Sequence, residues 1–271
     1  MTPPADAALV ALAGTLGAHA LAGFVGLLGL VLVAVAMLDA SLRRYSRRRQ
    51  RPASHPYATL FVRLLLGFAL IVGAAFAFAG IAEEIEPGEQ LAHLDQVFSD
   101  AVLASTPEGA RQIFAWVSHL GDPITLAVLG IAAVLVLALR GERLLAFAFG
   151  IAVGGNALLN VSLKHAFERA RPLHASGPTP FEGYSFPSGH SSGALVAYGM
   201  LAYVLMRTLP PRWHLPAVLL CAAAAFAVGA SRIFIQAHFA TDVAAGFASG
   251  SAWLTICILS VEWAQHGRRL R

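Results

Sequence analysis

Residues 144–172 read LLAFAFGIAVGGNALLNVSLKHAFERARP, and this stretch decides the fold class. Its first part, 144–163, contains no charged side chain. An apolar run of about 20 residues is long enough to cross the hydrocarbon layer of a bilayer as a helix. Lys164, which ends the run, is the single lysine among the 19 basic residues of the chain. The stretch therefore predicts a membrane-spanning helix with an unusual cation at its end.

The composition of the whole chain agrees with a membrane protein. Of its 271 residues, 57% are hydrophobic and 13% are charged, and the mean hydropathy is +0.67. Soluble domains carry about 25% charged residues. We expect an all-α, polytopic transmembrane helix bundle with seven spans. The predicted spans are 10–38, 58–82, 124–139, 144–163, 189–207, 216–232 and 239–263.

The arginines predict how the spans are oriented. They cluster in 41–57, 140–143, 207–215 and the C-terminal tail, which lie on one side of a seven-span chain. Basic loops mark the cytoplasmic side, so the N-terminus is expected outside. This topology accounts for the net charge of +4 without a nucleic-acid partner. Cys221 and Cys257 fall inside apolar runs, and no Cys/His cluster appears, so neither a disulfide, a metal nor another cofactor is predicted.

The first predicted span and a basic cytoplasmic linker occupy residues 1–57, and the other six spans lie in residues 58–271. Between the second and third spans, 83–123 is an acidic segment on the outer side that is too long for a simple connection. Its apolar residues recur at helical spacing, which predicts a short helix along the outer membrane surface.

Three polar stretches fall at span ends on that outer side. In the first, Lys164 and Arg171 are seven residues apart, nearly two helical turns, and Pro172 follows. We expect both cations on one helix face. Because they oppose the positive-inside bias, they suit an anionic ligand. A lysine among so many arginines indicates a pocket that accepts only a compact charge at 164.

The second stretch, Phe186-Pro187-Ser188-Gly189-His190, opens the fifth span. Ser188 is expected to cap the helix, and Gly189 to let its backbone approach a ligand. The free N–H groups of a helix N-terminus favour phosphate.

The third stretch runs from Ser231 to Asp242. His238 and Asp242 are four residues apart at the start of the last span, so the carboxylate can hold one imidazole nitrogen and leave the other free to attack. Arg232 is six residues before His238, off that face of a continuous helix. The chain must bend between them if both meet one ligand.

Together these residues predict a metal-free site for phosphoryl transfer. Three cations and the helix N-terminus would hold the phosphoryl oxygens. His238 would attack phosphorus, and His190 would protonate the leaving oxygen and then activate a water. Asp242 would orient His238.

The three stretches resemble the motifs of the PAP2 superfamily, the type 2 phosphatidic acid phosphatases. They match as KxxxxxxRP at Lys164–Pro172, PSGH at Pro187–His190 and SRxxxxxHxxxD at Ser231–Asp242. The resemblance implies a six-span core in residues 58–271, preceded by one extra N-terminal span and the basic cytoplasmic linker in residues 1–57. It implies the roles given above and phosphate contacts from Ser188 and Gly189. It also implies a lipid phosphatase that forms a phosphohistidine.

The expected substrate is a membrane lipid phosphate or diphosphate. Undecaprenyl diphosphate is favoured because the site faces outward from the bacterial cytoplasmic membrane. Phosphatidic acid, phosphatidylglycerol phosphate and lipid A phosphates stay open. A lipid phosphotransferase with the same site is one alternative, and a non-catalytic anion or lipid transporter is another.

Other polar residues near the motifs have simpler interpretations. A solvated surface is the favoured interpretation for four of them, His165, Glu168, Arg169 and His174. Turn chemistry at Gly121-Asp122-Pro123 accounts for Asp122, while His119 could line an entrance.

Overall fold

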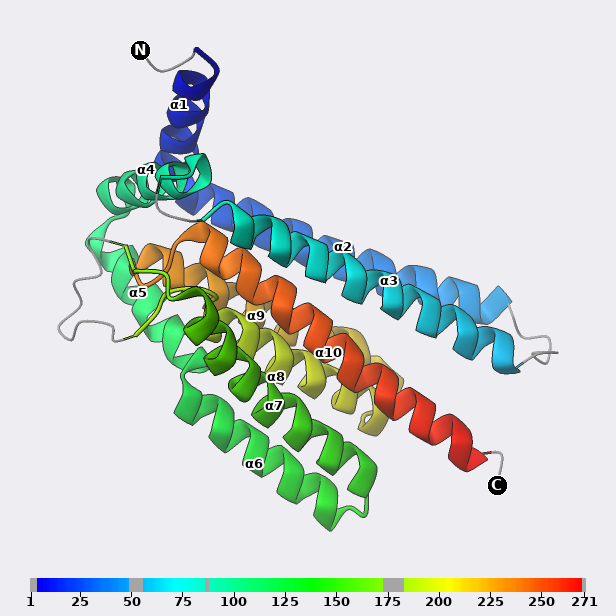
Figure 1. Ribbon diagram of the computed structural model, residues 1–271. Helices are drawn as coiled ribbons and strands as arrows, with labels where there is room; N and C mark the ends of the chain where they lie inside the picture. The colour runs from blue at the N-terminus through cyan, green and yellow to red at the C-terminus, as the bar shows by residue number, and fades with distance from the viewer. Residues whose placement is uncertain (1–3, 49–55, 86–87, 173–182, 270–271) are drawn as a thin grey trace.

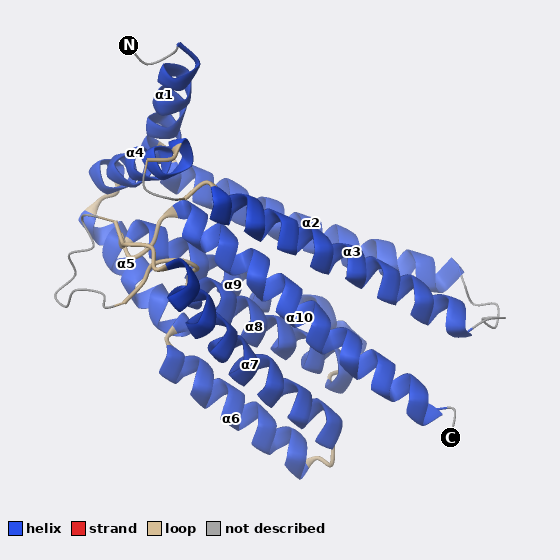
Figure 2. Cartoon of the chain, in the orientation of Figure 1, coloured by secondary structure: helices blue, strands red, loops and turns tan. Residues whose placement is uncertain are grey.

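The chain is a helix bundle throughout the part that the structure describes. The computed structural model describes residues 4–48, 56–85, 88–172, 183–269, and every regular element in these ranges is helical (Figures 1 and 2). The helices are α1 Pro4–Ala18, α2 Ala20–Arg48, α3 Pro56–Glu83, α4 Gln90–Ser105, α5 Glu108–Ser118, η1 His119–Gly121, α6 Pro123–Leu139, α7 Arg143–Phe167, α8 Gly189–Thr208, η2 Pro211–Trp213, α9 His214–Phe234 and α10 Ala240–Arg269.

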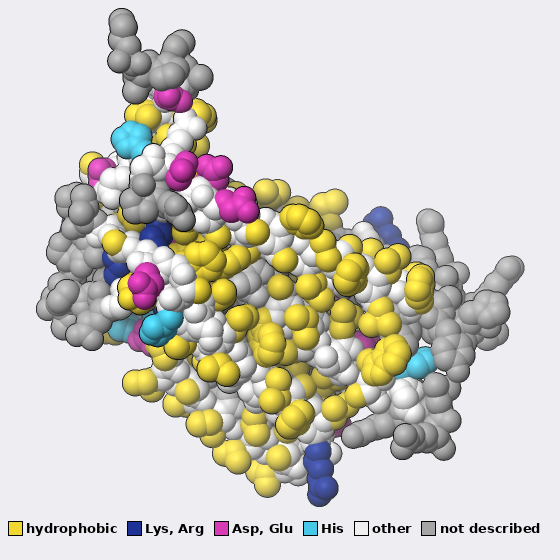
Figure 3. All heavy atoms as spheres, in the orientation of Figure 1, with side chains coloured by type: hydrophobic (Ala, Val, Ile, Leu, Met, Phe, Trp, Pro, Cys, Tyr) yellow, Lys and Arg dark blue, Asp and Glu magenta, His cyan; other side chains and the backbone are white. Residues whose placement is uncertain are grey.

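The long apolar helices confirm an integral, polytopic α-helical protein. Among the described residues, five helices are long and apolar enough to cross a membrane, or six if α5, η1 and α6 form one span bent by 42°. The predicted count was seven. The helix α8 does not meet the apolar criterion because its first turn is polar and faces the bundle interior. Apolar side chains cover much of the face shown in Figure 3, as expected for contact with lipid.

The first predicted span is divided into two helices. The break falls at His19, where α1 ends and α2 begins. In Figure 1 α1 stands away from the bundle and meets α4, while α2 packs against α9. Gly17 permits the α1–α4 contact, because an added Cβ there would lie 2.6 Å from the carbonyl oxygen of Phe98. The N-terminal part is thus a surface helix followed by a long apolar one.

The acidic segment also contains more structure than one surface helix. It forms α4, α5 and the short η1, which leads directly into α6. The helix α4 lies at the end of the bundle where α8 and α10 begin (Figure 1). This arrangement places the acidic segment over the three polar stretches rather than away from them.

Basic residues lie at the opposite end of the bundle. Arg140 and Arg143 flank the turn between α6 and α7, and Arg207 ends α8. At the same end Arg63 pairs with Glu262 at 2.6 Å, which joins α3 to α10. Arg49, Arg51 and Arg271 of the predicted basic segments lie outside the described residues.

Close packing joins α7, α8 and α10 below the polar end. Phe149, Val196 and Met200 are fully buried in one cluster. The indole N–H of Trp253 donates to the carbonyl of Ala152 at 2.9 Å. Small residues and interhelical hydrogen bonds stabilise helix contacts where lipid offers no hydrophobic driving force. These contacts hold the helices that present the three polar stretches.

Candidate active site

The two cations of the first stretch reach the site from different elements. The helix α7 ends at Phe167, and Glu168 adopts a left-handed conformation with φ 47°. Arg171 therefore lies in the loop that follows, and the prediction that it shares a helix face with Lys164 is wrong. The guanidinium of Arg171 returns by donating to the carbonyl oxygens of Gly183 at 3.1 Å and Ala237 at 2.7 Å. The tertiary contacts, not helical periodicity, bring it to the site.

The second stretch forms the expected helix N-terminus. The hydroxyl of Ser188 accepts hydrogen bonds from the backbone N–H of Ser191 at 3.3 Å and from its hydroxyl at 2.9 Å. The backbone N–H of Ser188 donates to the carbonyl of Asp242 at 3.0 Å. Ser188 is fully buried, whereas Gly189 and His190 face a cavity. A side chain at Gly189 would meet Asn160, since an added Cβ would lie 2.7 Å from its Oδ1 atom.

The third stretch bends between α9 and α10. The backbone N–H groups of Ala237 and His238 both donate to the carbonyl of Arg232, at 2.9 and 3.1 Å. Gln236 adopts a left-handed conformation with φ 59°, which costs a non-glycine residue about 1–2 kcal/mol. The bend brings Arg232 and His238 to one cavity although they are six residues apart.

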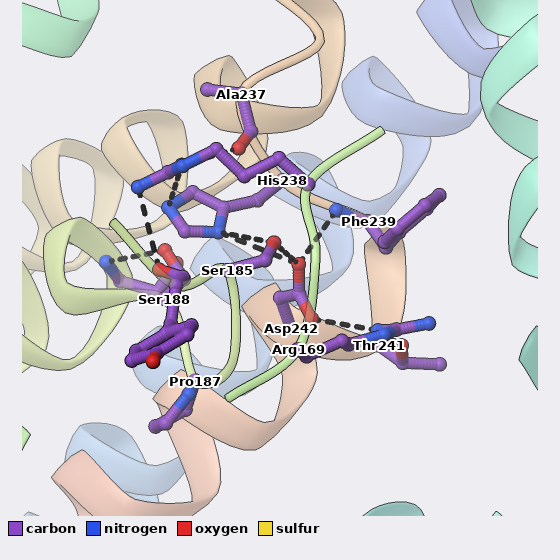
Figure 4. Close-up of polar contacts among 12 residues, drawn as sticks. Arg169, Ser185, Pro187, Ser188, Ala237, His238, Phe239, Thr241 and Asp242 are labelled. Atoms are coloured by element: carbon purple, nitrogen blue, oxygen red, sulfur yellow. Dashed lines mark hydrogen bonds and ion pairs between the residues drawn. The ribbon is translucent and has the colours of Figure 1, made fainter. Parts of the chain in front are cut away.

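His238 is held by a buried hydroxyl and a buried carboxylate (Figure 4). Its Nδ1 atom lies 3.4 Å from Oδ2 of Asp242 and 3.3 Å from the hydroxyl of Ser185. That hydroxyl donates its own hydrogen to the same carboxylate oxygen, so its lone pair can accept a hydrogen bond from the Nδ1–H group of His238. Asp242 also accepts from the backbone N–H of Phe239 at 2.9 Å. The arrangement favours protonation at Nδ1 and leaves the lone pair on Nε2, which lies 3.4 Å from a guanidinium nitrogen of Arg171.

We expect the imidazole of His238 to remain neutral at pH 5. Burial, with smaller effects of Arg232 and Arg171 and against the opposing effect of Asp242, lowers the pKa of His238 to about 3. The unfolded chain takes up this proton near pH 6.5. Its contribution to stability is therefore complete above that pH and is lost as the pH falls toward 3. Nitrogen NMR of histidine-labelled protein in detergent measures the protonation state of His238, whose signal is assigned with the His238→Ala variant. A His238 signal that titrates near pH 6.5 would contradict it.

Five cationic or imidazole side chains of the three stretches line one cavity of about 530 Å³. They are Lys164, Arg171, His190, Arg232 and His238. Among the described residues, no Asp or Glu lines it. Arg232 is buried and donates to the hydroxyl of Ser118 at 2.6 Å, which fixes its guanidinium. The cavity has the charge and the donors to hold a phosphoryl group and so supports the predicted site.

Asp122 contacts a site residue, contrary to its interpretation as a turn former. One carboxylate oxygen lies 3.0 Å from Nε2 of His190, and the other lies 2.7 Å from Nδ1 of the exposed His119. Its side chain makes no cap hydrogen bond to α6. The cations of the cavity disfavour an imidazolium at His190, whereas this carboxylate favours it. Asp122 therefore supports the protonated form that a general acid requires.

We expect Asp122→Asn to lower kcat about 10- to 100-fold, at or below the roughly 10²- to 10⁴-fold contribution that general acid–base catalysis usually makes. The amide keeps the shape of the side chain but removes the charge that favours protonated His190. Since Asp122 does not cap α6, the helix should persist. Phosphate release measured from pH 5 to 9 tests this, with the exposed Glu108→Gln of α5 as the matched control. Equal kcat values for Asp122→Asn and the unaltered protein would argue against the role.

Arg169 was also misassigned from the sequence. Its side chain is 9% exposed, and it pairs with Asp242 at 2.7 Å and with Asp95 at 2.9 Å. The interpretation as a solvated residue is wrong because α4 covers it, which the local sequence does not indicate. His165 and Glu168 are exposed, and His174 lies outside the described residues.

Comparison with known proteins identifies relatives that carry phosphatase names. A family model described as the PAP2 superfamily matches residues 143–266. A phosphatidylglycerophosphatase B from Bacillus subtilis is 40% identical over 100 residues, covering 36% of this chain and 48% of that protein. A lipid A 1-phosphatase from Rhizobium etli is 33% identical over 131 residues, covering 45% of this chain and 51% of that protein. The match thus spans about half the length of these two relatives.

Two further comparisons cover more of the chain. A lipid A 1-phosphatase from Rhizobium johnstonii is 30% identical over 205 residues, covering 64% of this chain and 79% of that protein. The crystal structure of a transmembrane PAP2 type phosphatidylglycerolphosphate phosphatase from Bacillus subtilis matches with a TM-score of 0.64 and 26% identity. That match covers 69% of this chain and 94% of the other. The fold of the core is therefore shared with a membrane phosphatase.

Proposed function

Since this chain belongs to the PAP2 superfamily, we propose that it is a membrane phosphatase that releases phosphate from a lipid phosphate or diphosphate. One observation carries the proposal: a single cavity is cationic at one end and apolar at the other. The cationic end holds the five site residues described above. The apolar part is lined by side chains of α6 and α7, namely Leu126, Ala127, Val153, Ala157 and Val161.

The apolar part suits a hydrocarbon chain. Ala127, Ala157 and Val161 line the cavity and are exposed on helices that face lipid. A lipid could therefore enter sideways, with its phosphate toward the cations and its chain between α6 and α7. This geometry favours a lipid substrate over a free phosphate ester, which has no use for the apolar part.

The proposed reaction consists of two successive displacements at phosphorus. The Nε2 atom of His238 attacks phosphorus, and the bond from phosphorus to the lipid oxygen breaks as His190 gives that oxygen a proton. Lys164, Arg171 and Arg232 neutralise the phosphoryl oxygens in the transition state. A water then attacks phosphorus and gives a proton to His190, and the bond from phosphorus to Nε2 of His238 breaks. Inorganic phosphate leaves, and both histidines return to their starting forms.

The substrate is expected in the outer leaflet. The site lies at the end of the bundle opposite Arg140, Arg143 and Arg207, and basic residues mark the cytoplasmic side. In a bacterial cytoplasmic membrane this orientation favours undecaprenyl diphosphate. The relatives' names make the monophosphates of phosphatidylglycerol and lipid A the second candidates.

A lipid panel tests the proposed function. Purified protein in detergent is given undecaprenyl diphosphate, phosphatidylglycerol phosphate, phosphatidic acid and lipid A, and phosphate release is measured. We expect turnover of at least one lipid and inhibition by orthovanadate, which mimics five-coordinate phosphorus in the same cavity. Release that is unaffected by vanadate, or no release from any of the lipids, would contradict the proposal.

The same assay separates the alternatives. A phosphotransferase would transfer the phosphoryl group to an added acceptor lipid, so the modified acceptor would appear in place of free phosphate. A transporter would bind the lipid phosphate without releasing phosphate. Product analysis with and without acceptor therefore distinguishes the three.

A further inference from the structure

The surface helix α4 presents two buried polar side chains to the turn that carries His238. Asp95 and Ser99 are four residues apart, so they lie on one face of α4. Both are buried, although most of the acidic segment is exposed or half-buried. A buried carboxylate and hydroxyl are retained only where they find partners. Their partners flank the candidate nucleophile on both sides.

Asp95 makes the first connection. It accepts a hydrogen bond from the guanidinium of Arg169 at 2.9 Å. It also accepts from the hydroxyl and the backbone N–H of Thr241, the latter at 3.3 Å. The other Nη atom of Arg169 donates to Asp242 at 2.7 Å and to the hydroxyl of Thr241 at 2.8 Å. Asp95 therefore fixes the arginine that fixes the carboxylate beside His238.

Packing restricts Arg169 further. Its guanidinium carbon lies 4.4 Å from the ring centroid of Phe239, the residue after His238 (Figure 4). A guanidinium over an aromatic face gains a cation–π interaction and loses rotational freedom. Arg169 thus has its plane set by the ring and its two ends set by carboxylates.

Ser99 makes the second connection. Its hydroxyl donates to the side-chain carbonyl of Gln236 at 2.7 Å. The amide of Gln236 donates in turn to the carbonyl of Ile233 at 3.1 Å. Gln236 is the left-handed residue that makes the bend between α9 and α10. The bond from Ser99 therefore supports the strained residue two positions before His238.

We propose that Asp95 and Ser99 of α4 are positioning residues for the nucleophile His238. Asp95 acts through the carboxylate of Asp242, and Ser99 acts through the turn at Gln236. These two side chains support the nucleophile from outside the cavity, since neither of them lines it. The inference rests on the proposed function only in taking His238 as the nucleophile.

The electrostatics of the cluster agree with this role. Burial raises the pKa of Asp95, and its hydrogen bond from Thr241 and its pairing with Arg169 oppose the rise. The contacts that join Asp95 to the site therefore favour its ionised form, against the effect of burial. Without that charge, one end of the buried Arg169 would lose its anionic partner, and the hold on Asp242 would loosen.

Other residues of α4 pack against the N-terminal helix α1. Gly17 of α1 packs against Phe98 and Ala101 of α4. The hydroxyl of Ser105 donates to the carbonyl of Gly17 at 3.2 Å. The helix thus lies between the N-terminal helix and the turn, which limits how far it can move.

The test compares Asp95→Asn with the matched control Asp100→Asn. Asp100 lies on the same helix but is exposed and accepts from Gln96 at 2.7 Å. For Asp95→Asn we expect kcat to fall about 10- to 100-fold with KM and vanadate inhibition within about twofold, because misplacing a reacting group by about 1 Å costs up to 10²-fold. Ser99→Ala should lower kcat in the same way by a smaller factor. Asp100→Asn should match the unaltered protein.

A double variant tests the path of the effect. In an Arg169→Gln background, adding Asp95→Asn should change kcat less than about twofold, since both substitutions break one connection. Losses that multiply would overturn the proposed path. An unchanged kcat in both Asp95→Asn and Ser99→Ala would overturn the proposal itself.

The nitrogen NMR signal of His238 supplies a readout that does not depend on activity. We expect Asp95→Asn to change the balance of its two neutral tautomers, while thermal unfolding in the same detergent shows a folded protein. An unchanged signal would count against the inference even if no lipid in the panel is hydrolysed. Failure of the proposed function and failure of this inference are therefore distinguishable.

Discussion

Replacing His238 with alanine is expected to lower kcat for phosphate release about 10⁴-fold or more, because removing a covalent nucleophile removes the whole reaction path. The side chain is buried, and its Nδ1 is held by Ser185 and Asp242. Among the described residues that line the cavity, His190 is the other imidazole, and it is assigned the proton transfers. Phosphate release from the best lipid of the panel measures the loss.

A phosphoenzyme assay sharpens this prediction. The unaltered protein, stopped during turnover, should contain an acid-labile and alkali-stable phosphoryl group, and His238→Ala should contain none. His165→Ala is the matched control, since His165 is exposed in the last turn of α7, next to Lys164. Turnover of His238→Ala within tenfold of the control would exclude His238 as the nucleophile.

Replacing Arg232 with glutamine is expected to have the second largest effect, a loss of about 10²- to 10³-fold in kcat. Arg232 is buried in the cavity wall and is fixed by Ser118 at 2.6 Å. A fixed charge in a site that excludes water stabilises transition-state charge without reorganisation. Glutamine keeps a hydrogen-bond donor but removes the charge, so the phosphoryl oxygens lose one of three cations.

The comparison with Arg212→Gln separates the effect of losing the charge at position 232 from the general effect of losing one positive charge. Arg212 is exposed in η2, at the far end of the molecule, and its substitution should leave kcat unchanged. Arg232→Gln should also weaken inhibition by vanadate, because the same oxygens lose a partner. Full activity with unaltered vanadate inhibition would show that Arg232 does not contact the phosphoryl group.

Much of the site could be predicted because its members lie within short motifs. Ser188 caps α8 as its position before Gly189 indicates. The bend between Arg232 and His238 follows from their six-residue spacing, since a continuous helix would separate their faces. Local spacing constrains local geometry, so these features are readable before the chain is folded.

Other parts of the site depend on contacts that local spacing does not predict. Asp122 meets His190 across 68 positions of sequence, Arg169 meets Asp95 across 74, and Ser99 meets Gln236 across 137. Asp122 and Arg169 have ordinary local explanations, as a turn former and a solvated residue, and no motif includes Asp95 or Ser99. The structure shows their partners because α4 and η1 pack over the ends of α8, α9 and α10.

By itself the sequence determined that this chain is a bundle of membrane-crossing helices, and it predicted the five cationic and imidazole side chains that line one cavity. Apolar run length and short motif spacing are properties of neighbouring residues, so they can be read without coordinates. Only the tertiary structure decided that Arg171 reaches the cavity from a loop and that Asp95 and Ser99 of α4 contact residues on both sides of His238. Those outcomes depend on which helix ends meet, and helix packing is settled by shape and hydrogen bonding between distant segments rather than by any one segment.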